Sequence, residues 1–589
     1  MRLRSLVFLL PGLLAAPATP AAVFTVGSDA ACTHGNLLSA ISAASTNGAG
    51  LDEIRLATNL AYNSIVAPIA SHSVTIRGGY SSCSDTTASG RTVLRGTTAG
   101  ASGTIATSGT AAAYELNVEN LELREGGNTT RRGGALRIEG NFIVRLRNSV
   151  VTENLAGRGG GIFIDGIDDA ELVIDANSIV SSNVAAVSGG GIYCQRNGMV
   201  TLDGVIVANT AQDGTGDPTE SGNGGGVTLF GCFMNQNASP GLLGVLANTA
   251  DRHGGGYYLR NAARLFVIGN ANAPGRIAEN TAGDTGGGIA IYDAPALAQP
   301  SEAEIDNSYV DANVAPRGAG IGLVAGGSAR SARTRAAGAC HNDTLCSTMR
   351  DNDYPATAAA GIGCAAYVGP GGILKLRGTR VERNCPRGSG WTFRQGGDSR
   401  LELDSTVVAD NRGADPFFLE APFTGALEIG WSTITRNFAS LRIGMFSVPS
   451  GSINTGSLRV YGTLLGEPFE RLITVSGGGG LPPMVFAFDC LVVDTTFTQS
   501  VTPYRAIAMM PPYGMAAPGV GNYRLAAGTA RPVDWCDQGQ VLPRIAGDAG
   551  GVATIYDAPI ANQFGPRDIG AYEFVVASQP DPLFANGFE

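Results

Sequence analysis

The sequence predicts an all-β chain that winds into a right-handed parallel β-helix. Three observations predict this fold: glycine clusters recur about every 30 residues, an alternating apolar pattern follows each cluster, and an asparagine precedes each cluster. Periods of this size are typical of stacked repeat arrays rather than of several separate globular domains. Residues 61–500 are therefore expected to form one solenoid of roughly 13–16 coils, about 60–75 Å long at ~4.8 Å per coil.

Short glycine-rich clusters mark the repeat. Each has three small residues, mostly glycine, and successive clusters start 26 to 41 residues apart. Glycine permits positive φ and lets neighbouring coils approach closely. A flexible linker would carry no fixed apolar partners, and a nucleotide-binding loop would occur once, between a strand and a helix. The clusters lie at residues 133–135, 159–161, 189–191, 224–226, 254–256, 286–288 and 318–320, with a degenerate eighth copy at 359–361.

An alternating strand pattern follows each cluster. The third and fifth positions after the cluster start are mostly apolar, and a period of two is typical of a strand with one buried face. We expect these positions to stack into two columns of a continuous core. The pairs are Leu136/Ile138, Ile162/Ile164, Ile192/Cys194, Val227/Leu229, Tyr257/Leu259, Ile289/Ile291, Ile321/Leu323 and Ile362/Cys364.

An asparagine precedes each cluster, and an apolar residue stands three positions before it in every copy but the first, where Glu125 occupies that place. An amide side chain both donates and accepts, so asparagines one strand spacing apart are expected to bond to each other along the stack. Asparagine also tolerates the left-handed backbone of a sharp turn. The expected ladder comprises Asn154, Asn183, Asn209, Asn248, Asn280, Asn313 and Asn352, with Asn128 preceding the first cluster.

A second strand pattern fills the rest of each coil and continues after the glycine clusters fade. Leu401-Glu402-Leu403 leads to Asn411, and Leu427-Glu428-Ile429 leads to Asn437. Short strands without crossover helices cannot build an ordinary parallel sheet. They can coil instead, each strand pairing with its counterpart one turn later, and such crossovers are right-handed by strong preference.

The two ends differ from the repeat. Residues 1–22 are expected to be a secretory signal, with a basic start, a short apolar run and small residues. Within residues 23–60, Leu37–Ala44 is expected to form a short helix that covers the N-terminal end of the core. Residues 501–577 are assigned to closing coils and a C-terminal cap, and residues 578–589 to an extended tail that contains a possible sorting motif.

Ten cysteines in an exported chain favour disulfides. Zinc is disfavoured because the chain has no CxxC motif and only four histidines. The sequence does not fix connectivity, and pairing in chain order is one solution among many. That solution gives Cys32–Cys83, Cys194–Cys232, Cys340–Cys346, Cys364–Cys385 and Cys490–Cys536.

The repeat resembles the middle repeats of bacterial polymorphic outer-membrane proteins and related β-helix surface proteins, and the N-terminal segment is similar to the CSLREA-type segment of secreted β-helix proteins. The resemblance implies export to the outside or to the outer-membrane surface of a Gram-negative bacterium, and it implies little about activity. The segments that carry it, besides the repeats, are Cys32–Leu56, Ile76–Cys83, Tyr523–Leu525 and Asp568–Phe574. Separately, Leu583–Glu589 is similar to a terminal motif of some gammaproteobacterial exported proteins.

The charge of the chain excludes one class of partner. The 589 residues have a net charge of −10, or −12 without the expected signal, which argues against nucleic acid. Lysine occurs once, as Lys375, and arginine supplies the other basic residues. No stretch after the expected signal has the length and apolar character of a transmembrane helix.

We assign no catalytic residue, cofactor or metal from the sequence. Right-handed β-helices include pectin lyases and polygalacturonases, so several carboxylates are candidate catalytic groups. The simpler interpretation is that these carboxylates are exposed turn residues. His253 stands at a variable turn position, and a Ca²⁺ site in the insertions at 210–223 or 325–347 is the less favoured alternative to solvated loops. The carboxylates are Asp165, Asp168, Asp169, Asp175, Asp203 and Asp404.

The expected function is a non-enzymatic, adhesin-like protein that presents an elongated binding face to a polysaccharide or a surface protein. A polysaccharide lyase or hydrolase is the first alternative and a structural envelope component is the second. An enzyme should show three or more charged side chains converging in a groove on consecutive coils. An adhesin should show a flat or loop-rimmed face without them.

Overall fold

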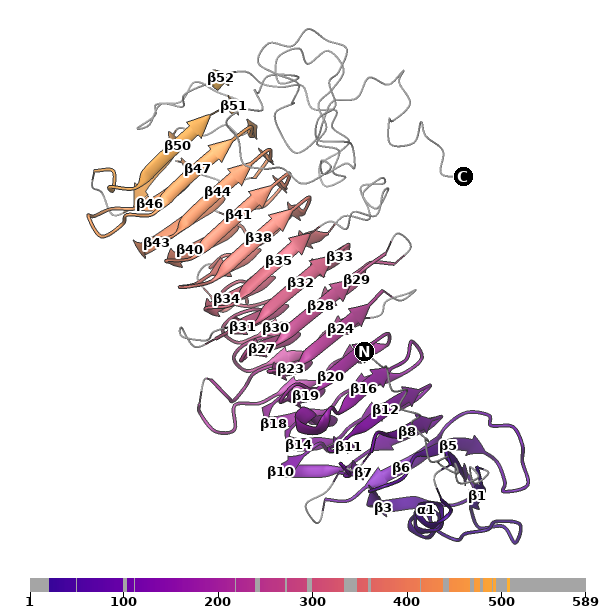
Figure 1. Ribbon diagram of the computed structural model, residues 1–589. Helices are drawn as coiled ribbons and strands as arrows, with labels where there is room; N and C mark the ends of the chain where they lie inside the picture. Colours follow the sequence, from indigo (N-terminus) through magenta and orange to yellow (C-terminus); the bar gives the residue numbers. More distant parts are fainter. Residues whose placement is uncertain are drawn as a thin grey trace, which may run out of the picture.

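A computed structural model of the chain describes residues 21–508 except 49, 99–102, 111, 218, 239–243, 271–272, 294–298, 333–346, 359–361, 414, 438–443, 467–470, 477–479, 490 and 494–505. These residues form an elongated rod with one helix at its N-terminal end (Figure 1). The expected signal, the assigned closing coils apart from residues 506–508, and the tail at 578–589 lie outside this part of the chain, as do the cysteines of two expected pairs.

Four sheets run along the rod, and every strand pairing within them is parallel, as a β-helix requires. From β2 onward, a coil visits sheet A, then sheet B, then, in six coils, sheet D, and then sheet C before it returns to sheet A one step further along. Sheets A and B have 16 strands each and sheet C has 14, which agrees with the expected number of coils.

Sheet A contains β1 (Val23–Val26), β2 (Asp52–Ala57), β5 (Val74–Tyr80), β8 (Tyr114–Glu119), β12 (Phe142–Arg147), β16 (Glu171–Ile174), β20 (Met199–Leu202), β24 (Phe233–Asn237), β28 (Arg264–Ile268), β32 (Glu302–Asp306), β35 (Ser328–Ala332), β38 (Ile373–Arg377), β41 (Arg400–Asp404), β44 (Ala426–Gly430), β47 (Ser457–Tyr461) and β50 (Val485–Asp489).

Sheet B contains β3 (Tyr62–Ile65), β6 (Thr92–Gly96), β9 (Leu121–Arg124), β13 (Val150–Thr152), β17 (Ile179–Ser181), β21 (Val205–Val207), β25 (Gly244–Leu246), β29 (Gly275–Ala278), β33 (Ser308–Asp311), β36 (Thr348–Arg350), β39 (Arg380–Glu382), β42 (Val407–Ala409), β45 (Thr433–Thr435), β48 (Leu464–Gly466), β51 (Leu491–Val493) and β52 (Ala506–Ala508).

Sheet C contains β4 (Ala67–Ile69), β7 (Ile105–Thr107), β11 (Leu136–Ile138), β15 (Ile162–Asp165), β19 (Ile192–Gln195), β23 (Val227–Phe230), β27 (Tyr257–Arg260), β31 (Ile289–Tyr292), β34 (Ile321–Ala325), β37 (Ala366–Val368), β40 (Phe393–Gly397), β43 (Phe417–Phe423), β46 (Gly444–Pro449) and β49 (Arg471–Ser476). Sheet D contains β10 (Gly127–Arg132), β14 (Leu155–Arg158), β18 (Val184–Ser188), β22 (Thr210–Ala211), β26 (Thr249–Ala250) and β30 (Thr281–Ala282).

The core is a set of stacked columns, because alternate residues of each strand point inward and the register of successive coils is matched. In sheet C, Ile162 is paired with Leu136 on one side and with Ile192 on the other. Toward the C-terminal end, aromatic residues replace the aliphatic ones, and the rings of Phe393, Phe417 and Phe446 lie 5.3 Å apart between successive centroids. The side chains of these columns are buried along the rod.

The eighth glycine cluster is four residues later than expected. Ile321 pairs with Ala366, so the column residues are Ala366 and Val368 rather than Ile362 and Cys364. Gly363 has a φ of +69°, and a Cβ there would lie 2.1 Å from the Ala366 carbonyl oxygen. The first cluster position therefore demands glycine, and Gly363-Cys364-Ala365 supplies it, whereas Ala359-Ala360-Gly361 lies outside the described residues.

A ladder of ten asparagines occupies the turn that follows sheet B. In each step, the Nδ2 of one asparagine donates to the Oδ1 of the asparagine in the next coil, at 2.7–3.1 Å. The backbone N–H of the same residue donates to that Oδ1 at 2.9–3.2 Å. All ten are at most 2% exposed. They are Asn154, Asn183, Asn209, Asn248, Asn280, Asn313, Asn352, Asn384, Asn411 and Asn437.

The ladder also explains the apolar residue three positions before each asparagine. The Nδ2 of Asn183 donates to the carbonyl oxygen of Val151, which stands three positions before Asn154 in the preceding coil. The Val151 side chain is buried in the core column of sheet B, so one residue fills the core and also accepts a ladder bond. Asn384 follows Val381 in the same pattern. The sequence pattern did not predict this member of the ladder, because no glycine cluster follows it.

The first rung of the ladder is not Asn128. The backbone N–H of Gly126 donates to the Oδ1 of Asn154 at 2.9 Å, so a glycine stands at the ladder position of that coil. Leu123 then stands three residues before it, and the apparent exception at Glu125 disappears. Asn128 lies on β10, where its side chain donates to the Thr98 carbonyl oxygen.

The left-handed residue of this turn is the one before each ladder asparagine, not the asparagine itself. Its φ lies between +51° and +60° in all ten coils and at Glu125. Left-handed backbone costs a non-glycine residue roughly 1–2 kcal/mol. The position is not restricted to glycine or asparagine, which indicates that the ladder bonds offset this cost. The residues that occupy it are Glu153, Ser182, Ala208, Ala247, Glu279, Ala312, Asp351, Arg383, Asp410 and Arg436.

A second set of buried polar groups lies at the corner between sheets A and B. The hydroxyl of Ser149 donates to Val118 of the preceding coil, and the Ser149 N–H donates to the hydroxyl of Ser178 in the next. Thr406 repeats the arrangement near the C-terminal end, donating to Leu376. These hydroxyl groups satisfy backbone groups that the corner removes from the strand ladders.

The N-terminal end of the core is covered by α1 (Leu37–Thr46), which confirms the predicted helical cap. Leu37, Ala40, Ile41 and Ala44 are buried, and the helix packs against β1, β2 and β4. Asn36 caps it, because its Oδ1 accepts a hydrogen bond from the Ser39 N–H.

Replacing one ladder asparagine should destabilise the rod. In Asn280→Ala, the Asn248 N–H and the Val245 carbonyl oxygen lose a partner in a buried turn. Because buried unsatisfied groups cost about 1–3 kcal/mol each, we expect the free energy of unfolding to fall by about 2–4 kcal/mol. Urea denaturation followed by circular dichroism measures it.

Asn128→Ala is the matched control, because Asn128 is partly exposed and off the ladder. It should change the free energy of unfolding by less than about 1 kcal/mol. Equal effects of the two substitutions would contradict a stabilising ladder.

Candidate binding cleft on sheet A

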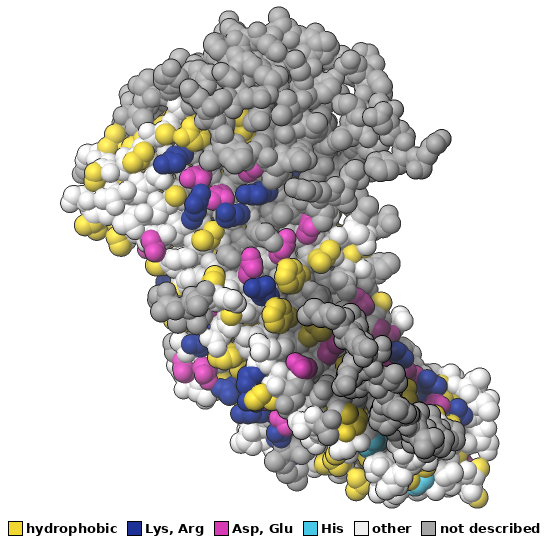
Figure 2. Space-filling view, viewed as in Figure 1, with side chains coloured by type: hydrophobic (Ala, Val, Ile, Leu, Met, Phe, Trp, Pro, Cys, Tyr) yellow, Lys and Arg dark blue, Asp and Glu magenta, His cyan; other side chains and the backbone are white. Residues whose placement is uncertain are grey.

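A charged cleft lies on the outer face of sheet A, over the consecutive strands β38, β41 and β44. Its volume is about 230 Å³, and the side chains of one column, Lys375, Glu402 and Glu428, face it in matched register. The cleft is lined by Lys375, Arg377, Arg400, Glu402, Leu403, Asp404, Glu428 and Gly430. Figure 2 shows basic and acidic side chains gathered on this part of the rod.

The strand pattern places these charges outward. In β41, Leu401 and Leu403 are buried in the core, so Arg400, Glu402 and Asp404 alternate with them on the outer face. The strands β38 and β44 follow the same alternation, and the parallel register brings equivalent positions to neighbouring places about 4.8 Å apart.

The acidic groups facing Arg400 are held in ion pairs. Arg400 bridges two carboxylates, with its Nε 2.5 Å from Glu402 Oε1 and its Nη2 3.0 Å from Glu428 Oε2. Lys375 Nζ lies 3.1 Å from Glu402 Oε2. The side chains of Glu402 and Glu428 are 14% and 9% exposed, whereas that of Arg400 is 47% exposed, so the carboxylates are shielded and their cationic partner faces solvent. The arrangement presents a fixed pattern of donors and acceptors.

Of the carboxylates considered from the sequence, Asp404 alone lines this cleft. Asp165 is buried against sheet C, where it pairs with Arg196 and accepts from Gln195 Nε2 at 3.0 Å. Asp175 stabilises a turn by accepting a hydrogen bond from the Ser178 hydroxyl at 2.6 Å. Asp203 accepts a hydrogen bond from Asn237 Nδ2 at 2.8 Å. Asp168 and Asp169 belong to a short 3₁₀ turn and its end. The structure therefore does not bring these acids together.

Sequence reasoning missed Glu402 and Glu428 as site residues. Each stands at the centre of an apolar-x-apolar strand, as Lys375 does in the strand before them. A charged central residue in three successive strands is the sequence pattern that could have indicated the site. Recognising their contact required the register between coils.

The carboxylates of the insertion at 210–223 make contacts within the loop and with neighbouring coils. The Arg252 guanidinium, which donates to Asp213 at 2.8 Å, holds the pKa of Asp213 below its usual range. The Thr219 N–H and hydroxyl both donate to Asp217 at 2.8 Å and lower its pKa. With the ion pair between Glu220 and Arg158, these contacts bind the loop to neighbouring coils as well as to itself. Of the insertion at 325–347, residues 333–346 lie outside the described chain.

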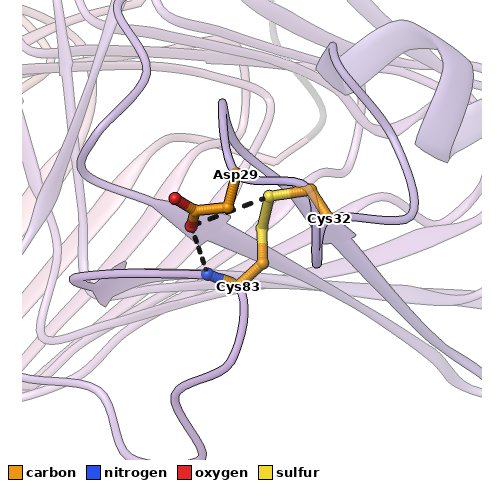
Figure 3. A group of neighbouring side chains, drawn as sticks. All are labelled: Asp29, Cys32 and Cys83. Carbon is orange, nitrogen blue, oxygen red and sulfur yellow. Dashed lines mark hydrogen bonds between the residues drawn. A yellow bond between two sulfur atoms is a disulfide. The ribbon is translucent and has the colours of Figure 1, made fainter.

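Three disulfides join cysteines that are neighbours in chain order: Cys32–Cys83, Cys194–Cys232 and Cys364–Cys385. Figure 3 shows the first, beside Asp29, whose carboxylate accepts the Cys83 N–H at 3.0 Å. Within the described chain, Asp29, Cys32 and Cys83 are the group with ligand spacing for a metal ion. Their sulfurs are bonded to each other and offer no thiolate, so this group is a structural staple.

His253 is buried at the corner between sheets D and C. Its ring contacts those of Tyr258 and Tyr292, each with a centroid 6.3 Å away. Asp284, Arg252 and Arg317 are the charged groups that act on it. Burial lowers the pKa of His253, and the attraction of Asp284, at 3.9 Å, compensates only in part.

The molecule thus belongs to the class of parallel β-helix proteins, with about 14 turns. Comparison of the chain with protein-family models finds no match, and neither curated proteins nor solved structures match it. In the part of the chain that the structure describes, no helix has the length and apolar character needed to cross a bilayer.

Acid should weaken the corner that contains His253. Because its folded-state pKa lies below the ordinary value of about 6.5, the folded protein binds fewer protons than the unfolded chain, and stability falls as the pH drops through 6.5. In His253→Gln, the decrease in the urea midpoint between pH 7.5 and pH 5 should be smaller than in the unsubstituted protein.

His34→Gln is the control, because His34 lies at the N-terminal end and is partly exposed. His72, whose pKa burial also lowers, is unchanged in all three proteins. A pH dependence that is identical in the His253 variant and the unsubstituted protein would refute the expected role of this ring.

Proposed function

We propose that this protein is an exported, non-enzymatic β-helix protein that binds a polysaccharide along the outer face of sheet A. The proposed binding face rests on the charged cleft, in which six ionisable side chains from three consecutive strands converge. The non-enzymatic part of the proposal rests on the pairing of Glu402 and Glu428 with Arg400. Protein pockets for small molecules typically measure roughly 300–1,000 Å³, so a cleft of about 230 Å³ suits one unit of a longer ligand.

The same face supports an elongated contact. Toward the N-terminal end, Met199 and Phe233 are register neighbours on β20 and β24, and they are 39% and 38% exposed. Ile268, at the end of β28, is 42% exposed. Exposed apolar side chains on an otherwise polar face are typical of interaction surfaces. They lie on the same sheet as the cleft and extend the proposed binding face along the rod.

Export is part of the proposal. Three disulfides in one chain are typical of an oxidising compartment, and the basic-apolar-small pattern of residues 1–22 fits a secretory signal. The resemblance to bacterial surface proteins adds the outer surface of a Gram-negative cell as the destination.

A polysaccharide lyase or hydrolase is the second candidate, and one observation favours it. Charged side chains converge in a groove on consecutive coils, which is the arrangement that we expected of an enzyme. Glu402 and Glu428 are register neighbours, and glycosidases use two carboxylates that flank the scissile bond. Binding is preferred because Arg400 engages both carboxylates, and neither is left as an unpaired acid or base.

The single lysine provides the test. Lys375 is the only side-chain amine of the chain, so acetylation with an amine-reactive ester can be followed by mass spectrometry on one peptide. A polysaccharide that retains the protein on an immobilised panel should slow acetylation of Lys375 at least about fivefold. The α-amine of the same molecules is the internal control and should react at an unchanged rate.

Retention by no polysaccharide of the panel, or retention without protection of Lys375, would refute the proposed binding face. The same incubations are assayed for reducing ends and unsaturated products. Product release that disappears in Glu402→Gln or Glu428→Gln would replace binding with catalysis.

A further inference from the structure

The cations of the cleft differ in how they are used. Lys375 and Arg400 are engaged by Glu402 and Glu428 at 2.5–3.1 Å. The side chain of Arg377 is partly exposed, lines the same cleft and has no ion-pair partner among the described residues. Its guanidinium is therefore the cation of the cleft that no ion pair among the described residues engages.

The neighbours of Arg377 leave room for that ligand. Asp404 is its register partner on β41, and Gly430 holds the equivalent place on β44. Since glycine has no side chain, the row opens beyond Asp404 on the side of β44. Arg377, Asp404 and Gly430 all line the cleft, so a ligand group bound in the cleft lies beside both the guanidinium and the carboxylate.

A guanidinium is a planar fork of donors that matches a carboxylate or a sulfate in bidentate geometry. Carboxylates such as Asp404 and Glu402 only accept hydrogen bonds when ionised, and they therefore suit the hydroxyl groups of a sugar. A neutral sugar offers hydroxyl groups to these acceptors but no anionic group to the Arg377 guanidinium. An acidic sugar would satisfy both.

We propose that Arg377 is the seat for the carboxylate or sulfate of an acidic polysaccharide. The inference rests on the proposed binding function and names the class of its ligand. The chain carries a net charge of −10 and repels polyanions at long range. The proposed attraction therefore comes from the contact with Arg377 and not from the electrostatic field of the whole protein.

Two matched pairs of polymers test the inference on the full-length protein. Polygalacturonate is compared with its fully methyl-esterified form, and dextran sulfate with dextran, so that the charged group is the difference within each pair. We expect at least one acidic polymer to bind about tenfold more tightly than its neutral counterpart. The pair that shows the difference tells whether the oxyanion is a carboxylate or a sulfate.

Three variants locate the effect. Arg377→Ala should weaken binding of the acidic polymer about tenfold and leave binding of the neutral polymer unchanged, and Arg377→Lys should restore part of the loss. Arg145→Ala is the control, because Arg145 is also an outward residue of sheet A, on β12, and pairs with Glu115 away from the cleft. Circular dichroism and the urea midpoint check that every variant is folded.

The outcomes separate the two proposals. Equal binding of acidic and neutral polymers, or an Arg377→Ala variant that binds the acidic polymer as tightly as the unsubstituted protein, overturns the role of Arg377 and leaves the binding face standing. Failure of the folded, unsubstituted protein to bind any polymer, both in these pairs and on the wider panel, overturns the proposed function and this inference with it.

Discussion

The hydrogen bond between the amide side chains of consecutive coils is the interaction on which the rest of the rod depends. Each coil of the ladder turns sharply after sheet B, and the turn places one residue in left-handed backbone and removes polar groups from the strand ladders. The amide of the next residue satisfies those groups in two neighbouring coils at once, because it accepts at Oδ1 and donates at Nδ2. A stack of such amides polarises along its length, so each bond strengthens its neighbours.

This arrangement explains why so much of the fold could be predicted from the sequence. A buried position in a stacked coil has the same surroundings in every repeat, so its residue type recurs and the period becomes visible. Val180 and Ile206, for example, fill the same column and serve the same ladder three residues before Asn183 and Asn209. The helical cap was also visible, since Leu37, Ala40, Ile41 and Ala44 follow helical spacing.

The errors arose where a backbone group replaced a side chain or where a coil changed length. At Gly126, a backbone N–H completes the ladder, which no residue pattern reveals. Near Gly363, a long insertion precedes the coil, and the counting rule placed the cluster four residues early. The cleft was missed for a different reason. Outward residues such as Glu402 carry no stacking constraint, and their contacts depend on the lengths of the intervening turns.

The unequal lengths of the coils have a consequence for how the chain assembles. In an array of near-identical rungs, a slip by one whole rung preserves most inward contacts and is a natural misfolded competitor. Coils whose glycine clusters start 26 to 45 residues apart do not superimpose after such a slip, because their surplus residues would fall at the wrong corner. The Cys194–Cys232 bridge, which ties one coil to the next, acts in the same direction by fixing the partner of that coil. The irregular lengths therefore serve as marks that distinguish otherwise similar rungs during folding.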